Sequence, residues 1–382
     1  MMLSRTPAAR LDAAVIEIHT AIAPLEAEWR TLEESGHATA FQTYDFVAPL
    51  YAAFGRHGRA EPVIVVVRPT PGAAPVMILP LCRYREGGLD LIAFADIRVA
   101  DYCAPVLAAD FPAEDGAGFL ALWKRIEKAL PRADMIHLRK LTETVGEVPN
   151  PLLHLPGHVP FVARAHGVPI ATPWREVAKE RMSTNALSLL RRRERKLAAF
   201  GPLAFRFETG GLEAESLYET LAAQRLDRFA RLGRDDLMRE PMWSEFYRDI
   251  ASGTTARACG SVFALTVGGE AIATGLGLVR GRSFLMIVMA FDMNRHSELA
   301  PGRLMLFRAM EALAEEGFDY FDLTIGDEPY KQSLGADDRL LREVARPLGF
   351  RGMIGTAAWR GKVFLRRYPG LKDKIKRLLR RN

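Results

Sequence analysis

Cysteine is scarce in this sequence, and long apolar runs are missing. The 382 residues include three cysteines, Cys82, Cys103 and Cys259, which are far apart and odd in number. Isolated thiols of this kind argue against a disulfide framework and a zinc site. The longest apolar run, residues 284–291, is much shorter than the roughly 20 residues that cross a bilayer. The first ten residues also lack the apolar centre of a signal peptide, so we expect a cytoplasmic protein.

Several motifs of metal and nucleotide chemistry are also missing. The eight histidines show no H-E-x-x-H pattern or other paired spacing, so we expect no metal centre. The nucleophile elbow G-x-S-x-G, the Walker A loop, and a G-x-G-x-x-G loop after a strand are absent as well. These absences exclude the common sequence signatures of metalloproteases, serine hydrolases and P-loop enzymes.

The net charge of +6 is concentrated at one end of the chain. Residues 360–381 contain ten Lys or Arg and one Asp, a net charge of +9, which leaves −3 for the rest. A specific DNA reader carries a basic face on its folded body, so we expect no specific DNA partner. Within this tail Leu371, Ile375 and Leu378 form an apolar stripe among cations. The stripe is typical of helices on anionic membrane surfaces, although a solvated helix packed on the second lobe remains the alternative.

Length and periodicity predict two related α/β lobes. Each half shows the order β-β-β-α-β, and Pro and Gly are dense between residues 149 and 173. We therefore place an N-terminal lobe at 1–165, a C-terminal lobe at 166–350 and a basic tail at 351–382. The expected elements are strands 62–68, 75–84, 89–95 and 134–138 with helix 113–130, then strands 261–267, 271–279, 283–291 and 320–324 with helix 304–316.

The strongest local signal is the start of a helix after the buried strand 283–291. Pro301 presets the first helical turn, and Gly302 lets a ligand approach backbone N–H groups that have no partner inside the helix. No carboxylate lies between residues 299 and 309, and cationic side chains surround the position, namely Arg295, His296 and Arg303. The pattern favours a pyrophosphate site, with an ordinary helix start as the alternative. At the matching place in the first half, Glu114 and Asp115 would repel an anion.

These motifs resemble a known superfamily. The helix start Ala300-Pro-Gly-Arg-Leu304, followed by F-D-L-T-I-G-D-E-P-Y-K at residues 321–331, resembles the GNAT acyltransferases. The nearest subgroup is the two-lobed CelD-like one of cellulose and exopolysaccharide biosynthesis, a relative of the Fem aminoacyltransferases. Like that subgroup, the connector at 292–302 has a single glycine instead of Q/R-x-x-G-x-G/A. The resemblance implies an α/β (α+β) fold of two tandem GNAT-like lobes, each with a mixed, largely antiparallel sheet flanked by helices.

The resemblance also implies a donor and its binding residues. The donor would be acyl-CoA, most simply acetyl-CoA, or the thioester of an acyl carrier protein, with no metal. Gly275 and Gly277 interrupt a strand, where glycine indicates either a bulge or the close approach of the donor's acyl-pantetheine arm. The residues expected to bind the donor are Arg295, His296, Pro301, Gly302, Arg303, Leu304, Gly275 and Gly277.

Acyl transfer requires a base, a polarised carbonyl and an acid for the leaving thiolate. Asp322 and Thr324 alternate onto one side of strand 320–324, next to the helix start. Asp322 is the candidate base or orienter of the nucleophile, with a structural carboxylate as the alternative. By resemblance, Tyr330 is the candidate acid for the thiolate, with packing between the lobes as its alternative. The candidate catalytic residues are thus Asp322, Tyr330 and Thr324.

Polar residues elsewhere are candidates for contact with the acceptor. Gln42 begins a helix in an F-Q-T motif, Asp101-Tyr102 resembles the A-D-Y motif of the subgroup, and helix 184–200 has a basic face. Capping or solvated faces are the alternative roles for most of them; Asp327, for example, stands where an N-cap is expected. The candidates are Gln42, Asp101, Tyr102, Arg192, Arg195, Arg225, Asp327 and Lys331.

Together these features predict an acyltransferase that works by direct transfer, without a covalent enzyme intermediate. The acceptor would be a small molecule or glycan, with an amino or hydroxyl group on a sugar, lipid precursor or polysaccharide intermediate. One alternative is a Fem-like aminoacyltransferase that takes its donor from tRNA. Another is a non-catalytic scaffold of an envelope-polysaccharide assembly, held at the inner face of the membrane by the tail.

Overall fold

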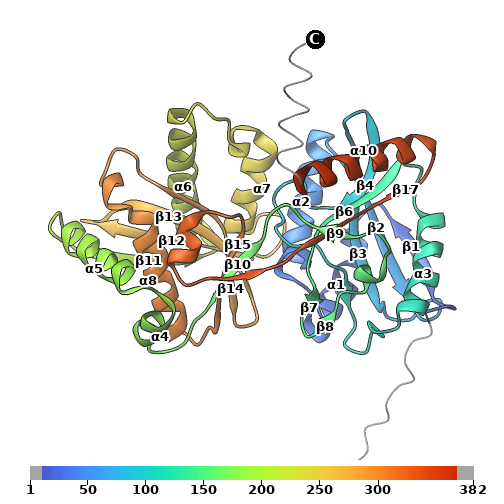
Figure 1. Ribbon diagram of the computed structural model, residues 1–382, viewed down its shortest axis with the longest axis horizontal. Coiled ribbons are helices and arrows are strands. Elements are labelled where there is room, and N and C mark those ends of the chain that lie inside the picture. Colours follow the sequence, from blue (N-terminus) through green and yellow to red (C-terminus); the bar gives the residue numbers. More distant parts are fainter. Residues whose placement is uncertain (1–10, 368–382) are drawn as a thin grey trace, which may run out of the picture.

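The computed structural model describes residues 11–367, which form two α/β lobes side by side (Figure 1). Within these residues the sheet of the first lobe has eight strands. In sheet order they are β1 (Val15–His19), β2 (Glu61–Arg68), β3 (Met77–Glu86), β4 (Leu89–Phe94), β6 (Met135–Leu141), β17 (Arg342–Pro347) and β9 (Val159–Pro160), with β5 (Val106–Leu107) beside β3. A small hairpin pairs β7 (Thr144–Val145) with β8 (Val148–Pro149).

Helices cover both faces of the first sheet. Alternate residues of β2 point to opposite faces, because side chains alternate along a strand. Val65 packs in the core under one helix and Val66 in the core under two others, so the continuous apolar run of β2 is buried on both sides. The helices are α1 (Glu26–Ser35) and α2 (Tyr44–His57) on one face and α3 (Gly116–Ala129) on the other.

The sheet of the second lobe has seven strands within the described residues. In sheet order they are β11 (Leu203–Thr209), β12 (Gly260–Val267), β13 (Glu270–Arg280), β14 (Ser283–Phe291), β15 (Tyr320–Ile325), β10 (Ala165–Pro169) and β16 (Asp337–Arg339). One face carries α6 (Gly211–Arg231) and α7 (Pro241–Ser252), and the other carries α4 (Trp174–Arg181), α5 (Thr184–Ala198) and α8 (Pro301–Glu315). A short helix, α9 (Pro329–Ser333), follows β15.

Both sheets are mixed and largely antiparallel. Among the strand pairs within residues 11–367, β4 with β6 and β14 with β15 run parallel, and the other ladder pairs run antiparallel. The predicted fold class is therefore confirmed, as is the order β-β-β-α-β in each lobe.

The division of the chain between the lobes differs from the expected boundaries. Ala165 already belongs to β10 of the second sheet, and after β16 the chain crosses back to the first lobe (Figure 1). There β17 pairs with β6, and α10 (Phe350–Arg367) packs on β17. The predicted boundary at residue 350 does not include this return to the first lobe, because pairing between strands about 200 residues apart leaves no local signal in the sequence. The stripe formed by Leu371, Ile375 and Leu378 lies outside the described residues.

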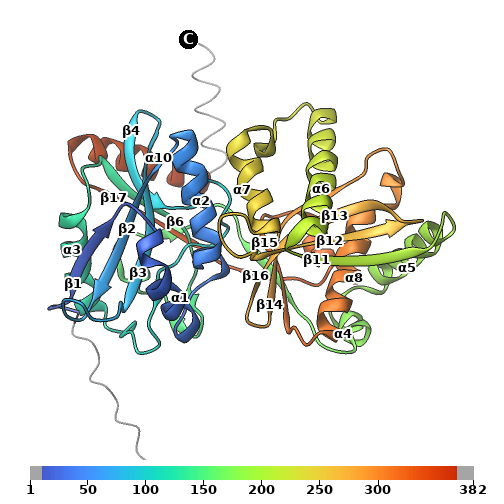
Figure 2. The same cartoon turned by 180° about the vertical axis from the view of Figure 1, so that it is seen from behind.

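The two lobes share a hydrophobic core. Helix α2 of the first lobe lies against α7 of the second, as Figure 2 shows from behind. The rings of Phe46 and Phe246 meet edge to face with centroids 5.3 Å apart, and Trp243 donates a hydrogen bond to the Ile97 carbonyl at 3.1 Å. Shared burial of this kind fixes the orientation of the lobes, so that residues from both can build one site.

Candidate functional site

Two parallel strands of the second lobe separate and leave a cavity between them. β14 and β15 pair only from Ser283 to Leu285 of β14. Beyond this point, residues 286–289 of β14 and 323–325 of β15 line a cavity of about 630 Å³. The Thr324 hydroxyl donates to the Met286 carbonyl at 3.0 Å and ties the strands together where they begin to diverge. We call this space the donor cavity, after the acyl donor that the sequence predicts for this lobe.

A β-bulge lies in the wall of the donor cavity. The pairing of β14 with β13 shifts by one residue, so that Ile287 is the extra residue between Met286 and Val288. A bulged residue is left out of the ladder, and Ile287 lines the cavity. Its backbone is therefore outside the regular pairing with β13.

The start of α8 opens into the same cavity. Ala300 is the N-cap residue in a left-handed conformation, with φ of 48°, and within the described residues no side chain caps the helix. Gly302 lines the cavity, and a Cβ there would lie 2.6 Å from the methyl carbon of Met289. The predicted open helix start is thus present, and glycine keeps its N–H groups accessible.

Cations without counterions surround this helix start. Arg228, Arg234 and Arg303 line the donor cavity, and no carboxylate of residues 11–367 forms an ion pair with any of them. Burial and the neighbouring Arg225 lower the pKa of Arg228, whose guanidinium lies 4.8 Å from the centre of the Phe291 ring. Arg225 differs, since it forms an ion pair with Asp236 at 2.8 Å. Arg228 and Arg303 are half-buried and Arg234 is exposed. A partly desolvated positive charge without a partner favours the binding of an anion.

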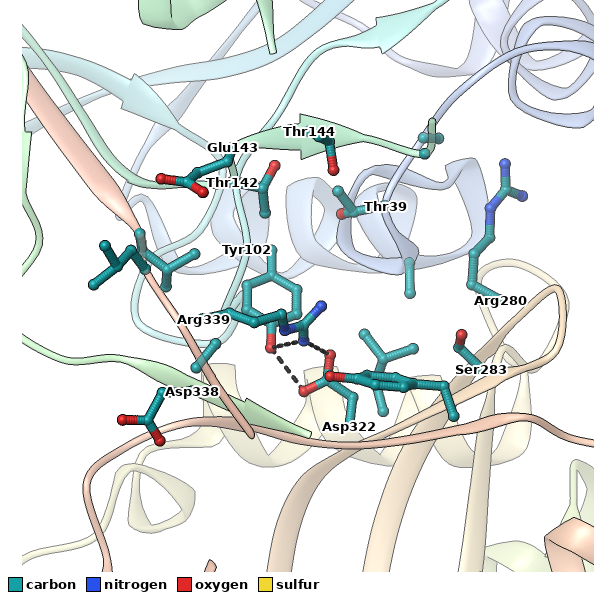
Figure 3. A pocket seen from close by; sticks show the side chains of 18 residues that line it. Thr39, Tyr102, Thr142, Glu143, Thr144, Arg280, Ser283, Asp322, Asp338 and Arg339 are labelled. Carbon is teal, nitrogen blue, oxygen red and sulfur yellow. Dashed lines mark hydrogen bonds and ion pairs between the residues drawn. The ribbon is translucent and has the colours of Figure 1, made fainter. Parts of the chain in front are cut away.

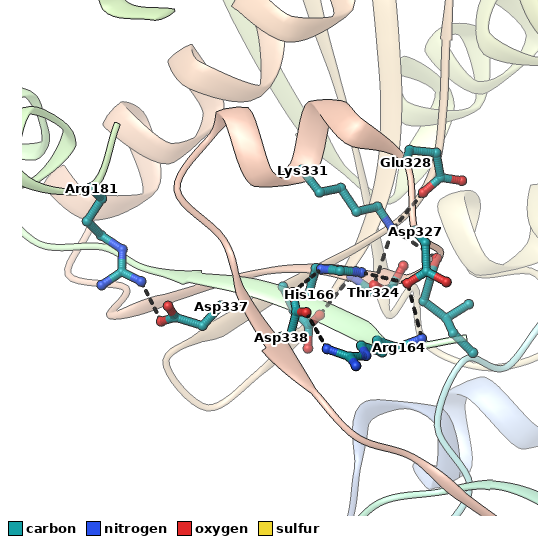
Figure 4. A network of polar contacts seen from close by, with 11 residues as sticks. Arg164, His166, Arg181, Thr324, Asp327, Glu328, Lys331, Asp337 and Asp338 are labelled. Atoms are coloured by element: carbon teal, nitrogen blue, oxygen red, sulfur yellow. Dashed lines mark hydrogen bonds and ion pairs between the residues drawn. The ribbon is translucent and has the colours of Figure 1, made fainter. Parts of the chain in front are cut away.

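The far end of the donor cavity is formed by α9. Tyr330 lines the cavity, and burial raises the pKa of its phenol above the usual range. Lys331 is 2% exposed and donates to the carbonyls of Thr324 at 3.2 Å and Ile325 at 2.9 Å (Figure 4). Glu328 pairs with Lys331 at 3.2 Å, so the carboxylate at this end is neutralised.

Asp322 is held by residues from both lobes. Tyr102 of the first lobe donates to its Oδ1 at 2.7 Å, the Thr324 N–H donates to the same oxygen at 2.8 Å, and Arg339 forms an ion pair with Oδ2 (Figure 3). Asp322 is 3% exposed. With three donors on a buried carboxylate, the arrangement is typical of a structural ion pair within the second lobe, to which the Tyr102 hydrogen bond connects the first lobe.

Asp101 is the second carboxylate at the junction. It is partly buried, and the nearby Thr324 hydroxyl, which donates to the Met286 carbonyl, favours the charged form of its carboxyl group. Lys140 and Lys331 lie close enough to attract it, and Asp322 close enough to repel it. Burial, partly opposed by these lysines, raises the pKa of Asp101 to about 6.

A second cavity, which we call the interlobe cavity, lies between the lobes and has a volume of about 680 Å³ (Figure 3). Leu285 and Asp322 line it, and the residue after each of them lines the donor cavity. The two cavities therefore adjoin at the point where β14 and β15 separate. Hydroxyl, aromatic and charged side chains share its wall, namely Thr39, Thr142, Thr144, Ser283, Tyr102, Tyr320, Arg280 and Glu143.

The matching gap of the first lobe is filled by its own chain. β4 and β6 pair in parallel at only two positions, and the chain that follows β4 then lies beside β6, with Cys103 N–H donating to the Lys140 carbonyl at 3.0 Å. Asp115 caps α3 by accepting from the Gly118 N–H at 2.9 Å. The open helix start is thus on α8, and the filling segment carries Asp101 and Tyr102 toward the second lobe.

Several predicted donor residues lie away from the donor cavity. A Cβ at Gly275 or Gly277 would lie 2.3 Å from the ring of Phe263 or Phe284, so both glycines make room for aromatic rings in the core. Arg295 pairs with Glu270 at 3.1 Å, and the His296 ring lies against that of Phe200. Leu304 is buried in the core beneath α8, and Pro301 is the first residue of that helix.

The remaining candidates have distinct surroundings. Gln42 is buried and donates to the Tyr102 carbonyl at 2.9 Å, so it positions the Asp101-Tyr102 segment rather than capping α2. Asp327 is exposed and lies 3.3 Å from Nε2 of the buried His166, while Glu328 is the N-cap residue of α9 (Figure 4). Arg192 and Arg195 lie on α5, where no described carboxylate pairs with them.

Sequence reasoning missed several residues of this region, among them Arg234 in the wall of the donor cavity. Arg228 follows Arg225 at helical i, i+3 spacing, which could have revealed it. His166 lies between Asp327 and Asp338, and Arg339 lies against Asp322, through strand pairing that no local pattern encodes. Within residues 11–367 no group of three His, Cys, Asp or Glu side chains is arranged to hold a metal ion.

Comparisons with known proteins agree with this geometry. Residues 185–332 match the family model described as the acetyltransferase (GNAT) domain. None of the curated proteins compared with the sequence matches it. Among solved structures, FemX is similar with a TM-score of 0.55 and 10% identity, over 86% of this chain and 96% of its own.

Two further structures share the fold across both lobes. The C-terminal domain (DUF2156) of a protein from Agrobacterium fabrum, described as a lysylphosphatidylglycerol synthetase, has a TM-score of 0.53 and 13% identity, over 90% of this chain and 97% of its own. L-PGS from Bacillus licheniformis has a TM-score of 0.50 and 11% identity, over 90% and 96%. At such identities the likeness establishes the fold. The second lobe is therefore similar to the GNAT acetyltransferase domain over residues 185–332, within a two-lobed fold that these structures share.

Proposed function

We propose that the protein transfers an acyl group from acyl-CoA to an amino or hydroxyl group of a second substrate. The observation that carries this proposal is the donor cavity itself: an uncapped helix start beside Arg228, Arg234 and Arg303, whose charges have no described counterion. Backbone N–H groups at a helix start and unpaired guanidinium groups together bind phosphates. The donor would be acetyl-CoA or another acyl-CoA, or the phosphopantetheine thioester of an acyl carrier protein.

The separated strands suit the rest of such a donor. A pantetheine arm carries amide groups that can pair with strand edges, and β14 and β15 present unpaired edges to the cavity. The N–H of the bulged Ile287 would polarise the thioester carbonyl as negative charge develops on its oxygen. Tyr330, kept protonated by its raised pKa, would donate its proton to the departing thiolate.

Asp101 of the first lobe is a better candidate for the base than Asp322 of β15. The two carboxylate oxygens of Asp322 are occupied by Tyr102, the Thr324 N–H and Arg339. Asp101 lines neither cavity, but it interacts electrostatically with Lys331 and Thr324 of the donor cavity wall, and its pKa of about 6 suits proton transfer near neutrality. In this mechanism Asp101 accepts the proton of the attacking amine or hydroxyl, a C–N or C–O bond forms, and the C–S bond breaks.

The interlobe cavity would hold the acceptor. Its volume of about 680 Å³ suits a small molecule or the end of a glycan, and it adjoins the donor cavity at Leu285 and Asp322. The hydroxyl side chains of Thr39, Thr142, Thr144 and Ser283 in its wall suit the hydrogen bonds of a sugar. These features support an acceptor from polysaccharide or lipid-precursor synthesis, as the CelD-like resemblance implies.

Ligand-induced thermal stabilisation tests the donor. A ligand that binds the folded state alone raises the melting temperature, so CoA and acetyl-CoA should do so for the wild-type protein. Arg303→Ala and Arg228→Ala should weaken this effect, with a rise in Kd of about tenfold each for a lost charge-assisted contact. Arg295→Ala is the matched control, since Arg295 is exposed, pairs with Glu270 and lies outside the donor cavity. No stabilisation of the wild-type protein by any acyl-CoA, with chain lengths compared by thiol release, would overturn the proposal.

One observation favours aminoacyl transfer from tRNA as a second candidate. Arg191, Arg192, Arg193, Arg195 and Lys196 of α5 pair with no described carboxylate. Burial lowers the pKa of Arg193 most, and the nearby positive charge of Arg303 lowers it further. An open row of cations beside the donor cavity could follow an RNA backbone, and FemX has the same fold.

Salt-dependent binding separates the two donors. Binding of tRNA that weakens steeply with salt, and that is lost in Arg192→Ala/Arg195→Ala, would support the second candidate. Acyl-CoA turnover that is unchanged in the same variant would support the first. If the protein responds to neither donor, the remaining candidate is the non-catalytic scaffold, the third function that the sequence predicts.

A further inference from the structure

Helix α10 has apolar residues on two opposite faces. On the inner face, Trp359 packs with Leu91, Met135 and Ala345 of the first sheet, and Gly352 is buried against the Asp134 carbonyl. On the outer face are large apolar side chains that are mostly exposed, namely Phe350 (77%), Met353 (60%) and Ile354 (59%). At about 100° per residue, this outer stripe lies on the side of the helix opposite Gly352 and Trp359. Only the inner face is needed to attach α10 to the lobe.

Positive charge flanks the outer stripe on both sides. By the same angular spacing, Arg351 and Lys362 fall along one edge of the stripe and Arg360 along the other. No Asp or Glu occurs in the sequence of α10. Arg360 and Lys362 form no ion pair with any described carboxylate, whereas Arg366 approaches Glu343 at 3.5 Å. Arg351 approaches Asp134 at 3.8 Å. The helix therefore presents an apolar strip bordered by cations, of which Arg360 and Lys362 have no described counterion.

We propose that the outer face of α10 lies on an anionic lipid surface. An apolar stripe flanked by cations fits such a surface, because the stripe enters the boundary of the acyl chains while Lys and Arg contact the phosphates of the headgroups. Clustered cations without carboxylates on the same helix disfavour a second copy of this face, since like charges would repel. The contact lies in the plane of the surface, because within the described residues no helix is long and apolar enough to span a bilayer.

The position of α10 in the fold fits this contact. The helix runs along the surface of the first lobe, with one end at the outer side of that lobe and the other toward the second lobe (Figure 1). No residue of α10 lines the donor cavity or the interlobe cavity. Attachment through α10 thus leaves both cavities open, and it does not depend on what the second lobe catalyses.

Vesicle co-sedimentation of the full chain tests the proposal. Vesicles of phosphatidylglycerol mixed with phosphatidylcholine should bind the wild-type protein, and vesicles of phosphatidylcholine alone should bind it at least tenfold more weakly. The variant Phe350→Ser/Met353→Ser/Ile354→Ser should lose at least tenfold in affinity. The control Val162→Ser/Leu212→Ser/Leu232→Ser, which removes equally exposed apolar side chains elsewhere, should bind like the wild type. Arg360→Glu/Lys362→Glu should weaken binding and flatten its salt dependence.

Three outcomes would overturn the proposal. The first is wild-type binding by the serine variant of α10, with an unfolding midpoint that matches the wild type. The second is binding that disappears on deletion of residues 370–382 but survives in the serine variant, which would assign the contact to the tail. The third is a wild-type dimer, seen by sedimentation without vesicle binding, that becomes a monomer in the serine variant; the face would then join two copies of the chain.

Discussion

At the scale of single residues, Asp101 and Asp322 lie near each other in different surroundings. Asp322 accepts three hydrogen bonds or ion contacts, while Asp101 has Lys140 and Lys331 nearby, with Asp322 and Tyr247 as further titratable neighbours. Burial favours the neutral form of a carboxyl group, and donors favour the charged form. The same residue type is therefore suited to proton transfer at 101 and to structure at 322.

The first prediction concerns Asp101→Asn. Because a base must be unprotonated, wild-type turnover should rise with pH through the Asp101 pKa of about 6. The variant should lose this rise, and kcat should fall by about 100-fold or more, while the Kd of CoA stays the same. Initial rates of thiol release between pH 5 and 8 measure it. Full turnover with the same pH limb in Asp101→Asn would remove Asp101 from the mechanism without affecting the donor assignment.

Asp322→Asn should act mainly on stability. Loss of the carboxylate leaves Tyr102 and Arg339 without their charged partner, and Arg339 is partly exposed. We expect the free energy of unfolding to fall by about 2 kcal/mol, a figure that allows for the partial exposure of Arg339. The rise of turnover with pH should persist in this variant. Urea unfolding measures the change. If Asp322→Asn leaves the stability unaltered but abolishes the rise of turnover with pH, then Asp322 is the base, as the sequence suggested.

At the scale of the elements, the start of α8 should be sensitive to any added side chain. Gly302→Val places atoms where phosphate would approach the N–H groups, and its Cβ would press on Met289. The Kd of CoA should rise by about tenfold or more, a loss of about 1.4 kcal/mol. Gly55→Val is the matched control, since Gly55 also lies in a helix and has open space around its Cβ. Equal CoA affinity of wild type and Gly302→Val would show that donors bind elsewhere.

At the scale of the whole molecule, the junction of the lobes should make stability depend on pH. Glu33 of the first lobe is buried, its carboxylate accepts the Tyr44 N–H at 2.7 Å, and its carbonyl accepts from Arg280 of the second lobe. Burial, opposed by Tyr44 N–H and Arg280, raises the pKa of Glu33 from 4.5 to about 7. Between these values the folded state holds the proton and the unfolded state releases it.

The contribution of Glu33 to the free energy of unfolding should therefore be largest below pH 4.5 and fall as the pH rises toward 7. The full change is on the order of 3 kcal/mol. Glu33→Gln should remove this slope, whereas the exposed neighbour Glu34 gives a control, Glu34→Gln, that should keep it. Denaturant unfolding at pH 4.5, 5.5 and 7 compares them; parallel curves for all three proteins would mean that Glu33 does not titrate in this range.

The sequence by itself determined the main elements and the open start of α8. Strand 283–291, the Pro301-Gly302 helix start and the absence of carboxylates around it are local features, fixed by periodicity and backbone chemistry, and they alone predicted an anion site on the second lobe. The tertiary structure decided which residues meet. Phe263 and Phe284 cover Gly275 and Gly277, Arg339 and Tyr102 occupy Asp322, and β17 carries the chain back to the first lobe. Such contacts join residues far apart along the chain, so only packing and strand pairing determine them.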